Sequence, residues 1–524
     1  MAHEVFDVCV IGGGINGAAV ARDAAMRGLS VALVEAGDFA GATSSRSSKL
    51  IHGGFRYLPQ GQFLLVYHAL RERERLRHLT APHLVRPIRF LFPTYRGRGF
   101  GRFTMATGLW LYDLLARTPR AERHRNLDAS AALEHEPALA RADLTGAALY
   151  YDAWADDARI TFENALDAGL HGAAAANYLA IESLSRVEGH VGAEGVRDLL
   201  GNRTFELRAS SFVNAAGPWV DDIRRLDDPA VKPSVRLTKG AHLVFPLSAL
   251  PVRESLVLAD DAGRIVFVMP HDRYVLVGTT DTDFDGDRRA VNADRSDIRY
   301  LLGVLAESLP SIALSEEDVV SSFAGLRALV TYGENKLSPS AVPREEQILE
   351  SASGMLSVAG GKLTTHREIA EKVVDRVMKK LGRSGSVSPT RTAKFPGARE
   401  LDQHDDAVTR LDREAADFLV RRYGTRAEIV ARIAIERPEL AAPLAPRCPA
   451  IGAEVIHAIR NEMAHCVADF LFRRTALVWR YPAEAEAAAP AVARMMAAEL
   501  GWDRAREESE LAGFVSDLKR RRAA

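Results

Sequence analysis

Three glycines near the start of the chain have the spacing of a dinucleotide-binding turn. Gly12, Gly14 and Gly17 form the pattern G-x-G-x-x-G directly after a short β-branched run, and an Ala-rich segment follows them. The first glycine permits a tight turn, the second lets a pyrophosphate approach the backbone, and the third lets the helix pack closely on the strand. We therefore predict a dinucleotide site with contacts at Gly12, Gly13, Gly14, Asn16 and Gly17.

Glu35 lies where a further cofactor contact is expected. It follows the run at residues 30–34, and a carboxylate there can accept hydrogen bonds from a ribose hydroxyl. The alternative is a plain glycine-rich turn beside a surface glutamate, but the strand, the helix and the acid together favour the dinucleotide. The motif alone does not distinguish NAD from FAD.

Hydroxyl side chains gather in a second segment, residues 41–58, whose sequence is GATSSRSSKLIHGGFRYL. Such a run fits a loop that passes a pyrophosphate and a flavin ring; a solvated serine-rich loop is the alternative. Two small-residue segments after predicted strands, residues 214–220 and 359–367, favour the cofactor, and the second also opens a helix. We predict cofactor contacts at Thr43, Ser44, Ser45, Ser47, Ser48, Lys49, Gly217, Gly361, Leu363 and Thr364.

These motifs need a sheet to position them. Residues 7–11 and 30–34 are predicted strands around a helix at 16–27, and a βαβ unit of this kind indicates a doubly wound α/β domain. We predict that residues 1–395 hold a Rossmann-like domain interleaved with a sheet-containing substrate domain, and that 396–524 form an all-helical C-terminal domain. Further strands are predicted at 211–213, 241–245, 264–269, 274–278 and 356–359, and helices at 63–77 and 158–170.

The composition of the 524 residues excludes several classes of protein. Hydrophobic residues make up 47% and charged residues 26%, the balance of a globular chain rather than a disordered one. Lys and Arg total 68 against 69 Asp and Glu, so no basic excess indicates a nucleic-acid partner. The three cysteines are too few and too scattered for a disulfide framework or a cysteine zinc site. No apolar run approaches the ~20 residues of a membrane-spanning helix, and we expect no signal peptide.

We predict no metal site. Residues 281–286, DTDFDG, copy the opening of an EF-hand loop. However, Asn292 stands where calcium requires a bidentate glutamate, and Arg288 and Arg289 place positive charge inside the loop.

Eight segments, in order from residue 10 to about residue 367, closely resemble the FAD-dependent, respiratory glycerol-3-phosphate dehydrogenases. The resemblance implies FAD as the cofactor, oxidation of the C2 hydroxyl of glycerol 3-phosphate to give dihydroxyacetone phosphate, and transfer of electrons to membrane quinone. It also implies that the helical tail is a cap domain. The segments are VIGGGINGAAVARDAAMRGLSVALVEAGDFAGATSSRSSKLIHGGFRYL, WADDARI, NAAGPWV, RLTKGAHLVFP, RIVFVMP, VLVGTTDTDFDGD, AGLRAL and GGKLTTHR.

The same resemblance assigns substrate-binding positions. A dianionic phosphate needs several cations, and arginine supplies a planar fork whereas lysine supplies a point charge. Thr279 matches a further substrate contact of the family. The positions implied for the phosphate are Arg56, Tyr57, Arg344 and Lys362.

Three residues are candidates for the chemical step. Arg327 resembles the arginine that orients the reacting oxygen, and its charge would stabilise a developing alkoxide. His242 is the first candidate for the base and His52 is the second, because imidazole titrates near neutral pH. The alternative for either histidine is a packed side chain that satisfies its own hydrogen bonds.

The family implies a cytoplasmic protein attached peripherally to the inner face of the cytoplasmic membrane. Residues 96–102 and the apolar residues after them are compatible with shallow membrane contact, as are the basic residues 519–522. A core helix and a solvated basic tail are the alternatives. The helical tail fits a packing cap, a homodimer surface or a partner site equally well.

Two other functions stay open at this point. One is another flavin oxidoreductase of the same architecture, such as an amine or 2-hydroxyacid oxidase, although several converging cations suit a phosphate better than a carboxylate. The other is a non-catalytic dinucleotide-binding protein. A related oxidase branch, which reduces oxygen, carries a large insertion with no clear counterpart here, and this favours the dehydrogenase.

Overall fold

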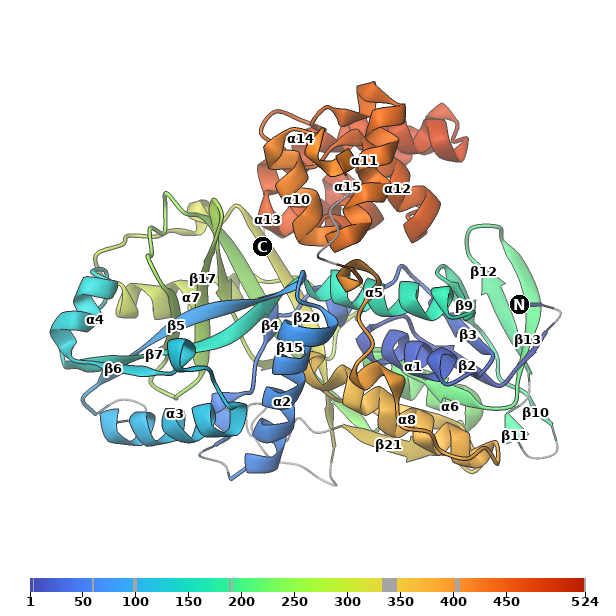
Figure 1. Ribbon diagram of the computed structural model, residues 1–524, viewed down its shortest axis with the longest axis horizontal. Coiled ribbons are helices and arrows are strands. Elements are labelled where there is room, and N and C mark those ends of the chain that lie inside the picture. The colour runs from blue at the N-terminus through green and yellow to red at the C-terminus, as the bar shows by residue number, and fades with distance from the viewer. Residues whose placement is uncertain are drawn as a thin grey trace.

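The computed structural model describes residues 1–2, 4–58, 61–97, 101–187, 190–191, 193–331, 346–400 and 406–522. The chain has three parts (Figure 1): a sheet with helices on the right, a larger sheet on the left, and a group of helices above both. Strands of the two sheets alternate along the chain, so the nucleotide-binding and substrate regions are interleaved as predicted. The predicted mixed α/β class with a helical C-terminal part is confirmed.

A six-stranded sheet carries the glycine turn. Its order is β21-β22-β14-β2-β3-β8, and the strand pairs are parallel except between β21 and β22. The central strands are buried on both faces, which explains their continuous apolar sequences. The strands are β2 (Val8–Ile11), β3 (Val31–Val34), β8 (Ala174–Ala176), β14 (Phe212–Asn214), β21 (Gln347–Glu350) and β22 (Leu356–Ala359).

The two faces of this sheet are covered differently. The helices α1 (Ile15–Met26), α5 (Asp157–Leu170) and α8 (His366–Lys380) pack on one face. A four-stranded sheet of order β1-β13-β12-β9 packs on the other, and α6 (Val220–Asp227) lies against β14 and β22. The smaller strands are β1 (Val5–Phe6), β9 (Leu179–Ile181), β12 (Ala193–Asp198) and β13 (Arg203–Ala209), with a hairpin of β10 (Arg186–Val187) and β11 (His190–Val191).

A ten-stranded sheet forms the left part of the molecule (Figure 1). Its main order is β19-β15-β18-β17-β16-β5-β7-β4, with β20 paired to β15 and β6 paired to β7. Helices α4 (Ala129–His135) and α7 (Arg295–Ser308) pack on one face, and α2 (Phe63–Arg75) and α3 (Arg102–Ala116) on the other. The strands are β4 (Leu50–Ile51), β5 (Val85–Tyr95), β6 (Arg125–Leu127), β7 (Leu144–Ala155), β15 (Val235–Pro246), β16 (Ser255–Ala259), β17 (Ile265–His271), β18 (Tyr274–Gly278), β19 (Thr282–Asp283) and β20 (Ser321–Val330).

Among the described residues from 406 onwards, the regular secondary structure of the C-terminal part is helical, apart from one isolated bridge between Pro443 and Ile451. Its own apolar core is rich in alanine, which lets the helices approach closely. The division of the chain after residue 395 stays a prediction. The helices are α9 (Asp406–Thr409), α10 (Arg413–Tyr423), α11 (Ala427–Glu436), α12 (Gly452–Glu462), α13 (Leu477–Arg480), α14 (Pro482–Leu500) and α15 (Arg504–Arg522).

Three long strands, β5, β7 and β20, have no counterpart in the sequence predictions. Two prolines, Pro87 and Pro93, interrupt β5, and proline within a run argues against a central strand. Alanine and glycine dilute the β-branched pattern of β7 and β20. The strand β20 matters most, because it carries Arg327.

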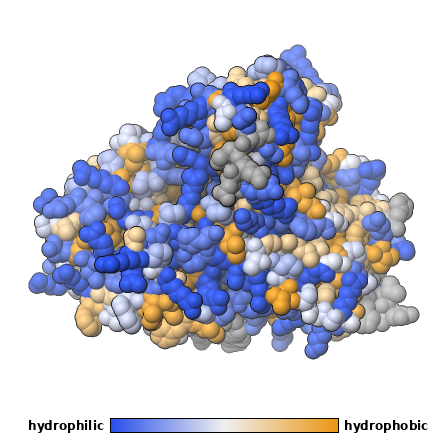
Figure 2. Space-filling view, in the orientation of Figure 1, coloured by the Kyte–Doolittle hydropathy of each residue, from blue (hydrophilic) through white to orange (hydrophobic). Residues whose placement is uncertain are grey.

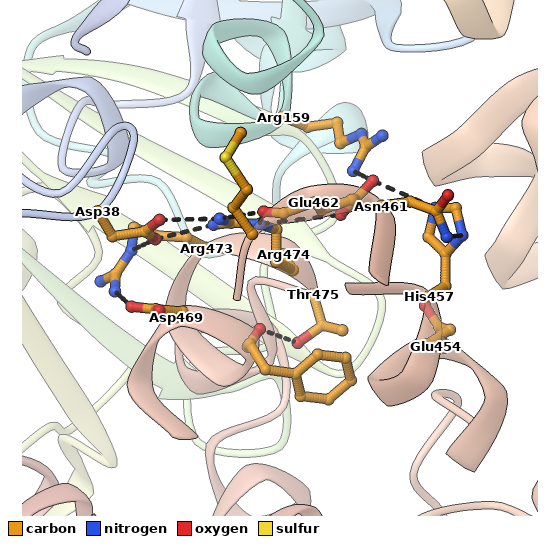
Figure 3. Close-up of polar contacts among 12 residues, drawn as sticks. Asp38, Arg159, Glu454, His457, Asn461, Glu462, Asp469, Arg473, Arg474 and Thr475 are labelled. Atoms are coloured by element: carbon orange, nitrogen blue, oxygen red, sulfur yellow. Dashed lines mark hydrogen bonds and ion pairs between the residues drawn. The ribbon is translucent and has the colours of Figure 1, made fainter. Parts of the chain in front are cut away.

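Buried charges join the helical part to the nucleotide-binding part (Figure 3). The guanidinium of Arg474 donates to both carboxylate oxygens of Asp38 at 2.8 Å and to the backbone carbonyl of Glu462 at 2.6 Å. The Glu462 carboxylate accepts a bond of 2.6 Å from Arg159 of α5. Burial raises the pKa of Asp38, but Arg474 and Arg473 outweigh it and hold that pKa at about 2. Because an unpartnered buried charge is costly, these contacts fix where the two parts meet.

Glu454 in α12 gives the helical part a pH dependence. Burial raises its pKa to about 7, and its carboxylate accepts bonds from the Ile451 N–H and the Tyr423 hydroxyl. The folded chain therefore holds this proton more tightly than the unfolded chain, and the resulting stabilisation is lost as pH rises towards 7 and above. Between pH 5 and pH 8 we expect wild type to lose about 2 kcal/mol of unfolding free energy relative to Glu454→Gln.

Chemical denaturation of both proteins at the two pH values measures this difference. Glu436→Gln, at an exposed position in α11, is the matched control and is expected to follow wild type. An equal pH response in wild type and Glu454→Gln would contradict the assignment.

Candidate active site

A cavity of about 1440 Å³ lies between the two large sheets. Its wall includes the glycine turn after β2, the hydroxyl-rich loop, the turn after β14, the exposed face of β15 and β20, and the turn after β22. This volume exceeds the roughly 300–1,000 Å³ of typical ligand pockets, so the cavity has room for a dinucleotide and a second small molecule.

The glycine turn has the tight geometry that its spacing predicts. Gly12 has φ +109°, and a Cβ on it would lie 2.7 Å from the Ala215 carbonyl oxygen. A Cβ on Gly17 would lie 1.8 Å from the carbonyl oxygen of Gly12, so only glycine lets α1 approach the strand. The first N–H of α1, on Ile15, donates to Ser44 Oγ at 2.9 Å.

Glu35 lies at the end of β3 on the cavity wall, as predicted. Its two carboxylate oxygens accept N–H bonds from Gly13 at 2.6 Å and from Gly37 at 2.7 Å. Burial raises the pKa of this carboxyl. The Glu35 carboxylate therefore holds the glycine turn through the Gly13 N–H while it lines the cavity. Gly13 and Gly17 support the turn and are not among the residues that line the cavity.

Most hydroxyls of the serine-rich loop hold the loop in place. Thr43 Oγ1 donates to the Leu326 carbonyl at 2.6 Å, Ser45 Oγ donates to the Ala42 carbonyl at 3.3 Å, and Ser47 Oγ donates to Asp157 at 2.6 Å. Thr43, Ser44, Ser47 and Ser48 also line the cavity, and their contact with the cofactor stays a prediction.

Lys49 is placed differently from its prediction as a cofactor contact. Its ammonium group is buried and donates to Asp157 at 2.5 Å and to the Ser45 carbonyl at 2.6 Å. Neither Lys49 nor Ser45 is among the residues that line the cavity. Since a buried lysine needs partners, the role that this geometry gives Lys49 is to anchor the loop.

The residues around the glycine turn fit a flavin dinucleotide. The helical segment that begins at Leu363 and continues into α8 presents a second helix N-terminus to the cavity, next to Gly361 at φ +96°. Asn16 lines the cavity between the two N-termini. Its Nδ2 donates to the Gly360 carbonyl at 3.2 Å, and its buried Oδ1 has no partner among the described residues. Gly217 and Thr364 line the same wall.

His242 and Arg327 each lie over a glycine of a neighbouring strand. His242 of β15 stands opposite Gly278 of β18, where a Cβ would lie 2.2 Å from the imidazole. A Cβ on Gly240 would lie 2.3 Å from the Arg327 guanidinium. Both side chains line the cavity. The two glycines therefore leave the space that the imidazole and the guanidinium occupy.

His242 is a buried, neutral imidazole. Its Nε2 lies 2.8 Å from Ser48 Oγ, and its ring stacks on Phe323 with centroids 4.9 Å apart. Burial lowers its pKa well below the usual value, and Arg327 and Lys49 lower it further. The ring is therefore unprotonated at neutral pH, which is the state that a general base requires.

Arg327 is held by the turn after β18. It donates to Thr279 Oγ1 at 3.0 Å, to the Thr280 carbonyl at 3.2 Å and to Asp281 at 3.1 Å. The structure thus joins the predicted catalytic arginine to the predicted substrate contact Thr279. Asp281, noted in the sequence only as part of a calcium-like pattern, is an ion-pair partner of this arginine.

Lys362 and Tyr57 lie together on the cavity wall, with Lys362 Nζ 3.9 Å from the centroid of the tyrosine ring. His52 also lines the cavity, and its backbone is tied to Thr364 Oγ1. Arg344 and the side chain of Arg56 lie outside the described residues, so their roles stay predictions.

Several arginines of the cavity wall were not predicted from the sequence, among them Arg46 and Arg473. Arg46 belongs to the serine-rich loop and donates to the Val291 carbonyl at 3.4 Å. Arg473 comes from the helical part, between α12 and α13, and donates to Asp469 at 2.5 Å. No local motif indicates Arg473, because only the packing of the helical part brings it to the cavity.

Comparisons with known proteins agree with this geometry. Residues 7–374 match the family model described as FAD dependent oxidoreductase, and residues 388–507 match the C-terminal domain of alpha-glycerophosphate oxidase. The chain is 36% identical over 498 residues to an aerobic glycerol-3-phosphate dehydrogenase of Staphylococcus saprophyticus, covering 91% of this chain and 87% of the relative. This chain belongs to the family of FAD-dependent glycerol-3-phosphate dehydrogenases.

Two solved structures support the fold, and the first also supports the cofactor. The glycerol-3-phosphate dehydrogenase from Bacillus halodurans, complexed with FAD, matches with a TM-score of 0.82 and 30% identity, covering 100% of this chain and 96% of the other. A glycerophosphate oxidase from Mycoplasma pneumoniae with FAD bound shares the fold, with a TM-score of 0.58 and 19% identity over 75% of this chain and 99% of the other. The prediction of FAD as the cofactor of this dehydrogenase-family chain is confirmed.

We expect Gly278→Ala to displace the His242 ring, because the added methyl group overlaps it. If His242 is the base, kcat should fall about 100-fold or more, within the range that general-base catalysis contributes. Bound flavin should be retained, because Gly278 is not among the residues that line the cavity.

Steady-state kinetics together with the flavin absorbance of the purified variant measure both effects. Gly303→Ala in α7, where an added Cβ meets nothing within 4 Å, is the matched control and should keep wild-type kcat. A wild-type kcat in Gly278→Ala would rule out this role for His242.

Proposed function

We propose that this protein oxidises sn-glycerol 3-phosphate to dihydroxyacetone phosphate and passes the electrons to membrane quinone. The observation that carries the proposal is that a neutral histidine, a positioned arginine and a lysine line the same cavity as the FAD-binding turns. When bound, FAD supplies the acceptor for the hydride that leaves C2. The names of the curated relatives point to the same substrate.

The substrate phosphate is assigned to Lys362 and Tyr57, with Arg56 and Arg344 as predicted additional cations. Lys362 supplies a compact positive charge against the tyrosine ring, and the phenol body keeps water from one side of it. A dianion bound here also raises the pKa of nearby groups, so substrate binding offsets part of the pKa depression at His242.

The chemical step needs two groups at C2. Arg327, oriented by Thr279 and Asp281, stabilises negative charge on the C2 oxygen as the hydroxyl proton leaves. His242 accepts that proton, and His52 is the second candidate. The substrate loses one proton to the histidine and one hydride from C2, which leaves the ketone of the product.

Lys362→Met tests the phosphate assignment. We expect KM for glycerol 3-phosphate to rise roughly 10- to 100-fold while kcat changes much less. The reason is that the contact between Lys362 and the phosphate stabilises the bound substrate and the transition state alike. Lys379→Met in α8, an exposed lysine on the following helix, is the matched control.

Anaerobic bleaching of the flavin by glycerol 3-phosphate is the primary readout for the identity of the substrate. Bleaching by an amino acid or a 2-hydroxy acid instead would overturn the proposal.

The acceptor is proposed to be quinone rather than oxygen. The relatives named dehydrogenases support quinone, whereas the C-terminal domain family takes its name from an oxidase, which keeps oxygen as a second candidate. Substrate-reduced protein mixed anaerobically with a soluble quinone analogue should regain its oxidised spectrum. Faster reoxidation by air, with stoichiometric hydrogen peroxide, would instead identify an oxidase.

We also propose a shallow contact with the membrane surface. No helix among the described residues is long and apolar enough to cross a membrane. Phe103, Trp110 and Leu114 of α3 are 86%, 61% and 58% exposed, and Figure 2 shows hydrophobic side chains gathered along the lower left edge, over this helix. Exposed Phe63 and Leu64 of α2 extend the apolar surface. Such a surface beside basic residues is typical of interfacial helices.

The C-terminal basic segment supports this contact less than its sequence suggested. Arg521 is buried, and its carbonyl accepts a bond of 2.7 Å from Ser322 of β20. The end of α15 is therefore packed against the sheet and is not a free basic tail. Homodimer formation stays a prediction.

Replacing Phe103, Trp110 and Leu114 by serine should abolish co-sedimentation with anionic liposomes while leaving turnover with a soluble quinone analogue unchanged. The apolar area removed is exposed, so little folding stability is lost. Serine at Leu170 and Val387, which are 55% and 73% exposed outside α2 and α3, is the control and should leave sedimentation intact. Undiminished liposome binding by the α3 variant would place the contact elsewhere.

A further inference from the structure

A second cavity, of about 240 Å³, lies between the ten-stranded sheet and the helical C-terminal part. Strands β5 and β17 supply one wall, and α10 and α13 supply the other; in Figure 1 these are the left sheet and the helices above it. None of its lining residues lines the large cavity. It is therefore separate from the proposed reaction site.

Four arginines face this cavity: Arg86 of β5, Arg421 and Arg422 of α10, and Arg480 of α13. They lie close enough to repel one another. Partial burial lowers the pKa of Arg86, and Arg421 and Arg480 lower it further. Burial lowers the pKa of His271, on the same wall, to about 3, and the arginines add to this shift.

The acids near the cavity do not balance these four charges. Asp272 accepts bonds from Arg480 at 3.1 Å and from the Tyr481 hydroxyl at 2.7 Å. Asp156 caps α5 by accepting the Arg159 N–H at 3.0 Å, and Glu454 lies 3.9 Å from Arg422. A fifth cation on the wall, Arg159, is committed to Glu163 and Glu462.

Several buried donors on the wall have no hydrogen-bond partner within the part of the chain that the structure describes. They are Arg422 Nε and Nη2, Arg480 Nε and Trp479 Nε1; His271 Nε2, a donor or an acceptor according to the tautomer, also has no partner there. Arg422 and Trp479 are only 4% and 7% exposed. A buried donor without an acceptor costs free energy, so this wall favours a ligand that brings acceptor atoms.

Aromatic rings form another part of the wall. The Trp154 and His271 rings have centroids 4.5 Å apart, and the His271 and Trp479 rings stack at 5.7 Å with an interplanar angle of 18°. Trp479 also lies 5.1 Å from Lys49 Nζ, which anchors the serine-rich loop of the large cavity.

We propose that this cavity is a second binding site, for a small phosphate-type oxyanion, with Arg86, Arg421, Arg422 and Arg480 as its cationic ligands. Arginine forks match the oxygens of a tetrahedral anion, and the indole N–H of Trp479 supplies a further donor. The volume suits inorganic phosphate or a small phosphate monoester. Because the ligand joins the sheet to the helices, its binding stabilises their contact.

Calorimetric titration of the holoprotein with inorganic phosphate tests the proposal. Lys362→Met is the background, since it weakens anion binding in the large cavity without touching the second one. We expect one phosphate to bind per chain and the thermal unfolding temperature to rise with phosphate at constant ionic strength. Adding Arg86→Gln and Arg421→Gln should weaken binding about tenfold or more. Both positions are exposed, and flavin content and circular dichroism verify folding.

Arg413→Gln removes one charge from α10 outside the cavity wall; it is the matched control for Arg421→Gln and should bind phosphate like the background. If the double replacement does not fold, Arg421→Gln alone replaces it. Tighter binding of methyl phosphate than of inorganic phosphate would identify a monoester as the ligand, and equal binding would identify the inorganic ion. Absence of phosphate binding in the Lys362→Met background, or unchanged binding after loss of the two arginines, would overturn the proposal.

Discussion

The candidate active site depends on the pairing of β15 with β18 and β20. This register sets Gly278 opposite His242 and Gly325 opposite Gly240, so the cavity-facing side of the sheet alternates large polar side chains with glycines. A slip of one residue would turn His242 to the other face. The pairing therefore determines where the imidazole lies. It also places the Arg327 cation close enough to lower the pKa of His242 and help keep the ring neutral.

The helical part contributes to both cavities. Arg473 reaches the wall of the large cavity, while both carboxylate oxygens of Asp38, in the loop after β3, accept bonds from Arg474. Buried ion pairs add little net stability, but breaking one leaves a costly charge, so they specify how two surfaces meet. The second cavity lies where the ten-stranded sheet meets these helices. Its arginines repel one another, and nearby acids do not fully balance their charge.

Local patterns in the sequence predict much of the fold and part of the site. The glycine turn and Glu35 are local features, because strand, turn and helix follow one another along the chain. Other features of the site depend on contacts between distant segments, which no local pattern reveals. They are the ion pair of Arg327 with Asp281, the glycines next to the His242 and Arg327 side chains, and the position of Arg473 on the cavity wall. Lys49 shows the converse: it stands in a cofactor-like run, yet its charge is used to hold Asp157. The long strand β5 could not be predicted, because its sequence contains prolines; in the structure, its pairing with β7 accommodates them.

The central claim is that side chains from separate strands and turns surround one phosphorylated three-carbon molecule beside the flavin. A crystal structure of the FAD-loaded protein with dihydroxyacetone phosphate tests this claim most directly. The account predicts the phosphate at Lys362 and Tyr57, the C2 oxygen within hydrogen-bond distance of Arg327, and a histidine, His242 or His52, adjacent to that oxygen. A ligand phosphate bound away from Lys362, with Arg327 out of reach of the C2 oxygen, would contradict it.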